Sequence, residues 1–279
     1  MPVLYVVGTP IGNLEDISAR ALRVLREVSL IAAEDTRTTR KLLARYGIDA
    51  PLASFHEHSP PSRTAALLEA LAVGDVALVS DAGTPAVSDP GAVLVAAAAE
   101  RGVSVVSVPG PSAVTSALAV SGFPADRFVF LSFLPRRQRE RRALLQSVAR
   151  QERAIVALEA PHRLRASLAD IAATLGDRRL AVCRELTKVH EEVFRGTATE
   201  ALDHFATPRG EITLVMEGAA PESPDEEGDA VWAHEELRRL RGLGGAARDA
   251  VSAVAGASGL SRRQVYGLWL ELQSEEAAP

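Results

Sequence analysis

The sequence predicts an α/β protein in which two α/β domains are followed by a small all-helical domain. Apolar, β-branched runs bounded by turn residues recur along the first 217 residues, and helical patterns separate them. An acidic segment at residues 221–230, "PESPDEEGDA", then ends this alternation, and only helical patterns follow it. A chain of 279 residues is long enough for such an arrangement.

Eight short apolar runs predict buried strands, several of them parallel. These are residues 3–7, 28–33, 75–80, 103–108, 127–132, 153–159, 179–185 and 211–217. Among the helical patterns between them, one begins at Ser18 and three others end at Gly47, Gly74 and Gly176. Glycine at a helix end is the usual left-handed residue that stops the helix.

The segment "SGFP" at residues 121–124 interrupts the pattern and predicts a domain boundary. We therefore expect α/β domains at residues 1–120 and 121–220, and a linker at 221–230 that is too polar to pack. A helical domain is expected at 231–279, with three short helices, the last capped by Ser261. Their order is compatible with a helix-turn-helix motif, although packing or dimerisation helices give the same pattern.

The composition excludes several classes of protein. The apolar run at 92–99 is too short to span a membrane, and the start "MPVLYVVG" lacks the basic region of a signal peptide. The single cysteine, Cys183, excludes an intramolecular disulfide, so we expect a cytoplasmic protein without membrane contact. The net charge of −5 arises in the segment 221–230, because the rest of the chain sums to zero.

Two common kinds of site have no support in the motifs. The chain has no phosphate-binding G-x-x-x-x-G-K-[ST] motif, and "GTPIGN" at 8–13 lacks the G-x-G-x-x-G spacing of dinucleotide sites. In "HEH", His56 and His58 are expected on one side of an extended strand, as a polar pair rather than as metal ligands. We therefore predict no metal.

Four loops that follow predicted strands predict a ligand crevice. They are "GTPIGN" (8–13), "EDTR" (34–37), "SDAGTPAVSDPG" (80–91) and "PGPSA" (109–113). In parallel sheets, ligands bind outside the carboxyl ends of the strands, where these loops would meet. Each loop alone would be explained by turn chemistry, but the four together favour a binding site.

These loops belong to a larger set of motifs. In chain order, between residues 3 and 217, the set is "LYVVGTPIGNLEDIS", "AAEDTRTTRKLL", "SFHEHS", "LVSDAGTPAVSDPG", "VPGPSAVTSAL", "FLPR", "EAPHR" and "RELTKVHEEVFRG". The set resembles the bacterial 16S ribosomal RNA 2′-O-ribose methyltransferases of the tetrapyrrole methylase superfamily, and the helical tail resembles that family's C-terminal domain. Ser59 stands where the family usually has Asn, and Ser132 where it often has Gly.

The resemblance implies a class III S-adenosylmethionine-dependent methyltransferase that acts as a homodimer, with the cofactor in the cleft between the two α/β domains. The implied substrate is the ribose of a cytidine in the decoding region of 16S rRNA, within the small ribosomal subunit. Carried over by motif, the cofactor contacts would be Pro10, Asp81, Gly83, Thr84, Pro85, Ser88, Pro109, Gly110, Ser112, Ala113, Ala160, Gly210 and Glu211.

Methylation of a ribose hydroxyl requires a proton acceptor, or a cation that stabilises the developing alkoxide. The candidates near predicted strand ends are Glu34, Asp35, Arg37, Glu159, His162, Glu185 and Lys188. We favour Lys188 as the base, because the chain has only two lysines among its 31 basic residues and a buried lysine, unlike arginine, can lose its proton. The alternative for Lys188 is a phosphate contact or an ion pair with Glu185 or Glu191.

Asp35 and Arg37 are assigned to the substrate side, with a helix cap beside a solvated arginine as the alternative. For RNA, the segment "PRRQRERR" predicts phosphate contacts by five arginines, although a solvated helix face would look the same. A second candidate lies at the start of the last helix. The predicted RNA-binding residues are Arg136, Arg137, Arg139, Arg141, Arg142, Arg262 and Arg263.

Two other functions are compatible with the pattern. One is methylation of a small molecule such as a tetrapyrrole precursor, but such an enzyme needs neither an arginine cluster nor a helical domain. The other is that of a non-catalytic RNA-binding assembly factor, whose cofactor loops should be eroded, whereas these loops are intact.

Overall fold

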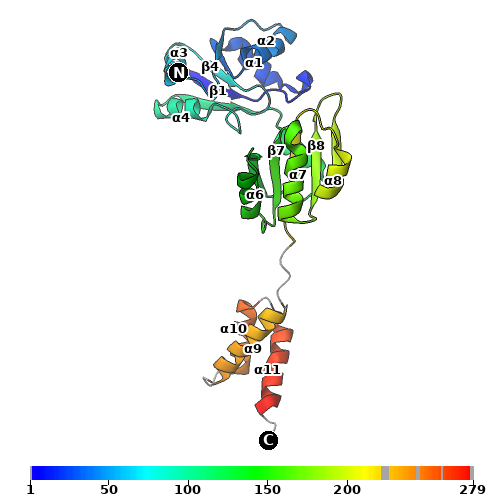
Figure 1. The fold of residues 1–279 in the computed structure, drawn as a ribbon. Coiled ribbons are helices and arrows are strands. Elements are labelled where there is room, and N and C mark those ends of the chain that lie inside the picture. Colours follow the sequence, from blue (N-terminus) through cyan, green and yellow to red (C-terminus); the bar gives the residue numbers. More distant parts are fainter. Residues whose placement is uncertain (1, 221–225, 243–245, 259, 277–279) are drawn as a thin grey trace. The chain divides into compact units, whose positions relative to one another are not determined.

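The computed structural model describes residues 2–220, 226–242, 246–258 and 260–276 of the chain (Figure 1). They belong to two compact units, unit 1 (Met1–Gly218) and unit 2 (Ala219–Pro279). Within the described residues, no helix combines the length and the apolar character that crossing a membrane requires.

The first sheet of unit 1 is wholly parallel, with strand order β3-β2-β4-β1-β5. Helices α1 and α2 pack around Leu25 and Ile31 on one face, and α3 and α4 pack around Leu67 and Leu94 on the other. This doubly wound arrangement places the loops at the carboxyl ends of its strands along one edge. The elements are β1 (Val3–Val7), α1 (Ala19–Glu27), β2 (Leu30–Ala33), α2 (Thr36–Arg45), β3 (Leu52–Ser54), α3 (Pro61–Val73), β4 (Val76–Val79), α4 (Ala92–Glu100) and β5 (Ser104–Val108).

The second sheet of unit 1 has the order β6-β7-β10-β8-β9. The β6–β7 pair is parallel, and the other three pairs are antiparallel. Helices α6, α7 and α8 cover one face, over a core that includes Leu145, Leu168 and Leu214. The elements are β6 (Phe128–Phe133), α6 (Gln138–Ser147), β7 (Ala154–Glu159), α7 (Pro161–Leu175), β8 (Arg179–Arg184), β9 (Glu192–Thr197), α8 (Ala198–His204) and β10 (Ile212–Met216).

Helix α5 (Ala113–Ser121) covers the other face of this second sheet. Its Ala117 and Leu118 belong to the same apolar cluster as Val156, Ala181 and Val215 of the sheet. The chain passes from one sheet to the other at residues 122–127, close to the expected boundary. However, the helix that the sequence assigned to the first domain packs on the second, and both sheets belong to one compact unit.

Strand β6 contains a bulge near its end. Phe130 pairs with Val156 and Phe133 with Leu158, so one extra residue lies between the two pairs on β6. Ser132, in this stretch, has φ of +59°, in the left-handed region that favours glycine. The bulge shifts the alternation of side chains by one, so Phe130 and Phe133 line a pocket while Leu131 and Leu134 pack in the core.

Unit 2 is a bundle of α9 (Glu226–Gly242), α10 (Ala247–Ala257) and α11 (Arg262–Glu276) around Leu237, Val254 and Trp269. The three expected helices are confirmed, and so is the cap: Ser261 Oγ accepts from the Gln264 N–H at 3.3 Å. The prediction of a linker is wrong for residues 226–230, because α9 begins at Glu226, and residues 221–225 lie outside the described residues.

The glycines at helix ends behave differently from one another. Gly47 has φ of +59°, as expected for a left-handed stop. The prediction is wrong for Gly74, whose backbone is extended (φ −165°, ψ 174°) because the chain runs directly into β4. Gly176 combines φ of +71° with ψ of −158°, a conformation open to glycine but outside the left-handed helical region.

Candidate active site

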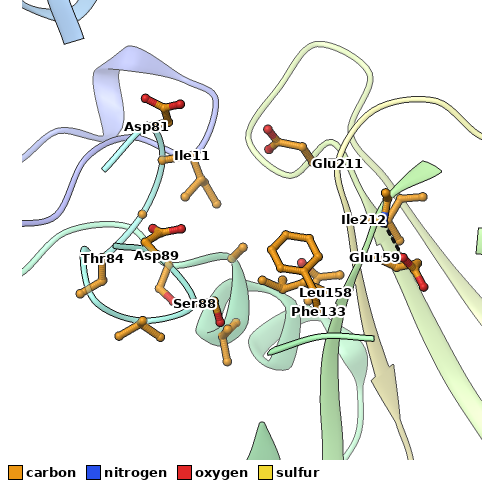
Figure 2. Close-up of a pocket in the computed structure, with 18 of the residues that line it drawn as sticks. Ile11, Asp81, Thr84, Ser88, Asp89, Phe133, Leu158, Glu159, Glu211 and Ile212 are labelled. Atoms are coloured by element: carbon orange, nitrogen blue, oxygen red, sulfur yellow. Dashed lines mark hydrogen bonds between the residues drawn. The ribbon is translucent and has the colours of Figure 1, made fainter. Parts of the chain in front are cut away.

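A pocket of about 480 Å³ lies between the two sheets of unit 1 (Figure 2). All four of the loops singled out in the sequence contribute to it, so the predicted crevice is confirmed, and its volume is in the usual range for small-molecule sites. The first sheet's loops contribute Ile11, Glu34, residues 81–84 and 87–89, and residues near the start of α5; the second sheet contributes Phe130, Phe133, Leu158, Glu159, Ile212 and Thr213.

Backbone contacts hold these loops together. Thr9 and Gly83 exchange two backbone hydrogen bonds, of 2.9 and 3.1 Å, which join the loop after β1 to the loop after β4. Gly8 and Gly110 touch directly: a Cβ on Gly8 would lie 2.8 Å from the Gly110 nitrogen, and a Cβ on Gly110 would lie 2.7 Å from the Gly8 oxygen. Neither position has room for a side chain, so the loops are packed backbone against backbone.

Three carboxyl groups line one wall of the pocket, those of Glu34, Asp81 and Asp89. The Asp81 N–H donates to Glu34 Oε2 at 3.2 Å. Burial raises the pKa of all three carboxyls. The pKa of Asp89 rises to about 6, because burial and the charges of Glu34 and Asp81 outweigh a hydrogen bond from Ser80. A positively charged ligand would therefore stabilise this wall.

The second sheet supplies the apolar wall and one buried acid. Figure 2 shows Phe133 and Leu158 on this side of the pocket, together with Ile212 and Glu159. Glu159 is 2% exposed, and its carboxylate accepts from the Ala160 N–H at 2.8 Å and from the Ser167 hydroxyl. This carboxylate is held by its own neighbours and is not free to move.

The predicted cofactor contacts fall into two groups. Those on the pocket wall are Asp81, Gly83, Thr84, Ser88, Ser112, Ala113, Ala160 and Glu211. The others do not line the pocket: Pro10, Pro85, Pro109, Gly110 and Gly210. For Gly210 the structure gives a different reason for glycine: φ is +80°, and a Cβ there would lie 2.3 Å from the Glu185 side chain. Gly110 likewise serves the contact with Gly8.

Lys188 lies in the loop after β8 and is held by two carboxylates. Its Nζ is 2.9 Å from Glu185 Oε1 and 3.1 Å from Glu211 Oε2, and Glu211 lines the pocket. Burial lowers the pKa of Lys188, but the hydrogen bonds to Glu185 and Glu211 outweigh it, so the pKa is raised. This contradicts the lowered pKa on which a role as general base depends. The ion pair with Glu185 is confirmed, whereas Glu191 accepts from the Thr187 N–H instead.

Asp35 caps α2 and Arg37 lies in the first turn of that helix, and neither residue lines the pocket. The Asp35 carboxylate accepts from the Arg37 N–H at 2.8 Å and from its guanidinium, which lowers the pKa of Asp35 to about 2. The helix-cap alternative is therefore confirmed. The Arg37 side chain is nevertheless 84% exposed, and the Asp35 N–H donates to Asp81 Oδ1 at 3.1 Å, which ties this cap to the pocket.

The arginine cluster divides between surface and core. Arg136, Arg137, Arg139 and Arg142 are exposed, as a contact with RNA requires. Arg141 is a correction: its side chain is only 4% exposed, and Nε donates to Asp170 Oδ2 at 2.8 Å. It is a core ion pair and does not reach the surface. In unit 2, Arg262 and Arg263 are exposed, and Arg262 donates to Ser252 Oγ at 2.8 Å.

His56 and His58 lie in a turn, not in the extended strand expected from the sequence. The His58 N–H donates to His56 Nδ1 at 3.2 Å, and the His56 N–H donates to Ser59 Oγ at 2.9 Å. Ser59 therefore closes this turn through its hydroxyl. In the part of the chain that the structure describes, no cluster of three or more metal-binding side chains is found.

Some pocket residues were not predicted. Asp89 stood within a quoted motif, but nothing in the pattern distinguished its side chain from the other turn residues. Phe133 was hidden by the bulge in β6, because a regular strand would point it away from Phe130. The sequence signal that could have found it is Ser132, at a position where the resembling family often has Gly.

The geometry suits a ligand that is both cationic and partly apolar. Carboxyl groups with raised pKa values lie on one side of the pocket, and Phe130, Leu158 and Ile212 lie on the other. An organic cation with a flat ring would satisfy both walls at once.

Comparisons with known proteins give concordant matches. A family model described as Tetrapyrrole (Corrin/Porphyrin) Methylases matches residues 3–202. A protein from Synechocystis sp. named Ribosomal RNA small subunit methyltransferase I is 48% identical over 279 residues, which cover 99% of this chain and 100% of that protein. A protein of the same name from Thermotoga maritima is 52% identical over 221 residues, 78% of this chain and 99% of that protein.

Solved structures with a similar fold are more distant in sequence. The methyltransferase CobJ aligns with a TM-score of 0.60 at 19% identity, covering 80% of this chain and 97% of that one. Uroporphyrin-III-C-methyltransferase from Thermus thermophilus aligns with a TM-score of 0.55 at 21% identity, covering 78% and 94%. At such identities the likeness establishes the two-sheet fold alone.

Proposed function

The chain belongs to the tetrapyrrole (corrin/porphyrin) methylase family and, within it, to the ribosomal RNA small subunit methyltransferases I, and from this membership we propose its reaction. The reaction is transfer of a methyl group from S-adenosylmethionine to the 2′-hydroxyl of a cytidine in the decoding region of 16S rRNA, within the small subunit. The observation that carries the proposal is the 48% identity over the full length of a relative with that family name. The choice of a cytidine ribose rests on the motif resemblance.

The pocket fits the proposed cofactor. When bound, S-adenosylmethionine supplies an electrophilic methyl group on a positively charged sulfur. Its positive groups would be held by Glu34, Asp81 and Asp89. A nearby cation favours the charged form of these carboxyls and so counteracts the burial that raises their pKa values. Leu158 and Ile212 would pack against its adenine ring.

Lys188 is proposed to act as a cation. Its ammonium stays protonated at neutral pH, because its pKa is raised, so it can stabilise negative charge on the ribose oxygen but cannot accept the proton. It also holds the Glu211 carboxylate at the pocket. Arg37, exposed beside the pocket loops, is proposed to contact a phosphate of the RNA, with Asp35 holding its guanidinium.

Cofactor affinity is expected to weaken as the pH falls through about 6. The Asp89 carboxyl is charged above its pKa of about 6 and neutral below it, and only the charged form attracts a cation. Below pH 6 the Kd for S-adenosylmethionine, measured by calorimetry, should rise by up to about tenfold per pH unit. In Asp89→Asn the Kd should be higher than that of wild type at pH 8, and it should stay nearly constant down to pH 5.5. An equally steep pH dependence in Asp89→Asn would contradict the assignment, and Asp126→Asn on the surface is the control.

Three exposed arginines are expected to set part of the salt dependence of RNA binding. Replacing Arg136, Arg137 and Arg139 by Ala should reduce the slope of log K against log salt by about 2–3, since each phosphate contact contributes about 0.7–0.9. The control removes the same charge from α1, as Arg20→Ala, Arg23→Ala and Arg26→Ala, which are also exposed. Equal slopes for the two triple variants in filter-binding measurements would refute the RNA contact.

We further propose that the protein acts in the cytoplasm as a homodimer. Exposed apolar side chains, such as Val93 on α4, which is 68% exposed, would provide apolar surface for contact with a second copy of the chain. Light scattering of the purified protein gives the mass directly, and a monomer at micromolar concentration would exclude the dimer.

The function is tested by incubating the protein with labelled S-adenosylmethionine and unmodified small subunits, naked 16S rRNA or tetrapyrrole precursors. Label on a cytidine 2′-oxygen of the RNA is the expected result. Label only on the tetrapyrrole would establish small-molecule methylation instead, and RNA binding without any label would indicate an assembly factor.

A further inference from the structure

Phe133 is an exposed aromatic ring on the pocket wall. Among the described residues of unit 1, the large apolar side chains exposed by 40% or more include two aromatic rings, Phe128 at 40% and Phe133 at 52%. Both are on β6, but only Phe133 lines the pocket. Half of a phenyl ring left in water beside a binding site is unfavourable unless a ligand covers it.

The backbone holds Phe133 in this position. The bulge at Ser132 turns its side chain to the same face as Phe130, and the next residue, Leu134, is buried in the core. The Leu134 N–H donates to the Leu158 carbonyl at 3.2 Å, and the Leu134 carbonyl accepts from Arg163 Nη1 at 3.2 Å. Ser132 keeps a left-handed conformation at this place, so the ring is presented by a specific and fixed local geometry.

The chain next to Phe133 is cationic. Arg136, Arg137 and Arg139 are exposed and follow the ring by three to six residues. An aromatic face combined with nearby arginines is the arrangement that binds an unpaired nucleotide, because the ring stacks on the base and the cations hold the phosphates. Phe133 and the loop of Ser88 and Asp89 line the same pocket (Figure 2).

We propose that Phe133 is the stacking platform for the base of the nucleotide whose ribose is methylated. This rests on the proposed function, since it takes the RNA as the substrate of the pocket. In this proposal the nucleotide leaves the RNA stack so that its ribose hydroxyl enters the pocket, and its base then needs a new apolar surface. Phe133 provides that surface on the pocket wall, where this residue is 52% exposed.

The test compares Phe133→Leu and Phe133→Tyr with wild type on unmodified small subunits. Phe133→Leu keeps apolar volume but removes the flat ring, so kcat/KM for the RNA should fall by about 10- to 100-fold. Phe133→Tyr should stay within about threefold of wild type, since the ring is kept. The KM for S-adenosylmethionine should change by less than about twofold in both. Phe128→Leu, an exposed phenylalanine on the same strand outside the pocket, is the matched control.

The outcomes separate the alternatives. A parallel rise in the KM or Kd for S-adenosylmethionine in Phe133→Leu would assign the ring to the cofactor's adenine and overturn the proposal. Loss of dimers in Phe133→Leu, or an unchanged kcat/KM for RNA, would overturn it as well. If wild type itself transfers no label to RNA, the proposed function has failed. Once the methylated nucleotide is mapped, an RNA that lacks that single base should give wild type and Phe133→Leu the same kcat/KM, because the stacking partner is then absent.

Discussion

Replacing Asp170 by Ala is expected to lower the free energy of unfolding by about 3–5 kcal/mol, the usual cost of leaving a buried charge without its partner. Asp170 on α7 is fully buried, and its carboxylate accepts hydrogen bonds from the side chains of Arg141, Arg142 and Gln138. Arg141 is itself buried and also donates to the Pro135 carbonyl at 3.1 Å. Removing Asp170 leaves the Arg141 guanidinium with carbonyl partners only. Thermal unfolding should shift down by about 10 °C.

The matched control is Asp126→Ala, which removes an aspartate that pairs with Arg127 on the surface and should change stability by less than about 0.5 kcal/mol. The double variant Arg141→Met with Asp170→Leu should be more stable than Asp170→Ala, because no buried charge remains. A Tm of Asp170→Ala equal to that of Asp126→Ala would contradict the role of the buried pair.

The pair also predicts acid sensitivity. Burial would raise the pKa of Asp170, but hydrogen bonds from Arg142, Arg141 and Gln138 outweigh it, and the pKa is lowered. Because the pKa of Asp170 is lower in the folded state than in the unfolded state, the charged carboxylate stabilises the fold at any pH above the unfolded-state pKa near 3.8. This stabilisation is lost as the pH falls through the folded-state pKa. The difference in stability between wild type and Asp170→Ala should therefore shrink in strong acid.

Replacing Lys188 by Met is expected to reduce kcat for RNA methylation by about 100-fold, the usual effect of removing one group that stabilises transition-state charge. The Lys188 stem packs against Gly12, where a Cβ would lie 2.4 Å from Lys188 Cγ, so the ammonium is held beside the pocket loops. Methionine keeps this packing and removes only the charge, which leaves Glu185 and Glu211 without their cation.

Lys188→Arg distinguishes the two roles of this residue. If Lys188 acts as a cation, arginine should keep at least about a tenth of the wild-type kcat. A general base would instead make the Arg and Met variants equally inactive, because arginine does not give up its proton. That outcome would restore the base assignment if, in addition, the kcat of wild type rises with pH across a pKa and this rise is absent in Lys188→Arg. Glu185→Gln, which removes one partner but keeps the ammonium, should have a smaller effect than Lys188→Met.

The sequence located central strands better than edge strands. The two strands that it missed, β3 and β9, lie at sheet edges. β3 has only three residues, and β9, "EVFRGT", has only two large apolar side chains, Val193 and Phe194, among polar residues and a glycine. An edge strand is paired on one side only and is often short or polar, so a search for apolar runs passes over it. The edge strands β5 and β6 do carry such runs and were found.

The same limit applies to the site. Three of the four loops after parallel strands, all except "EDTR", are recognisable by their Gly and Pro residues, and all four contribute to the pocket lining. Burial of an individual charge is a tertiary property: nothing in "PRRQRERR" separates Arg141, which faces Asp170 on another helix, from its exposed neighbours. The ion pairs of Lys188 likewise depend on Glu211, which is 23 positions away in the chain and reaches Lys188 only through the pairing of β8 with β10.

The packing of α5 on the second sheet restricts the positions at which two genes of this family can be joined into a chimera. A crossover at residue 122 would join α5 of one parent to the second sheet of another, and Ala117 and Leu118 would then meet foreign partners at Val156, Ala181 and Val215. Moving the crossover before α5 would instead divide the loop that contributes Ser112 to the pocket. Chimeras within unit 1 should therefore need compensating changes, whereas exchange after Gly218 leaves every strand of unit 1 with its own helices.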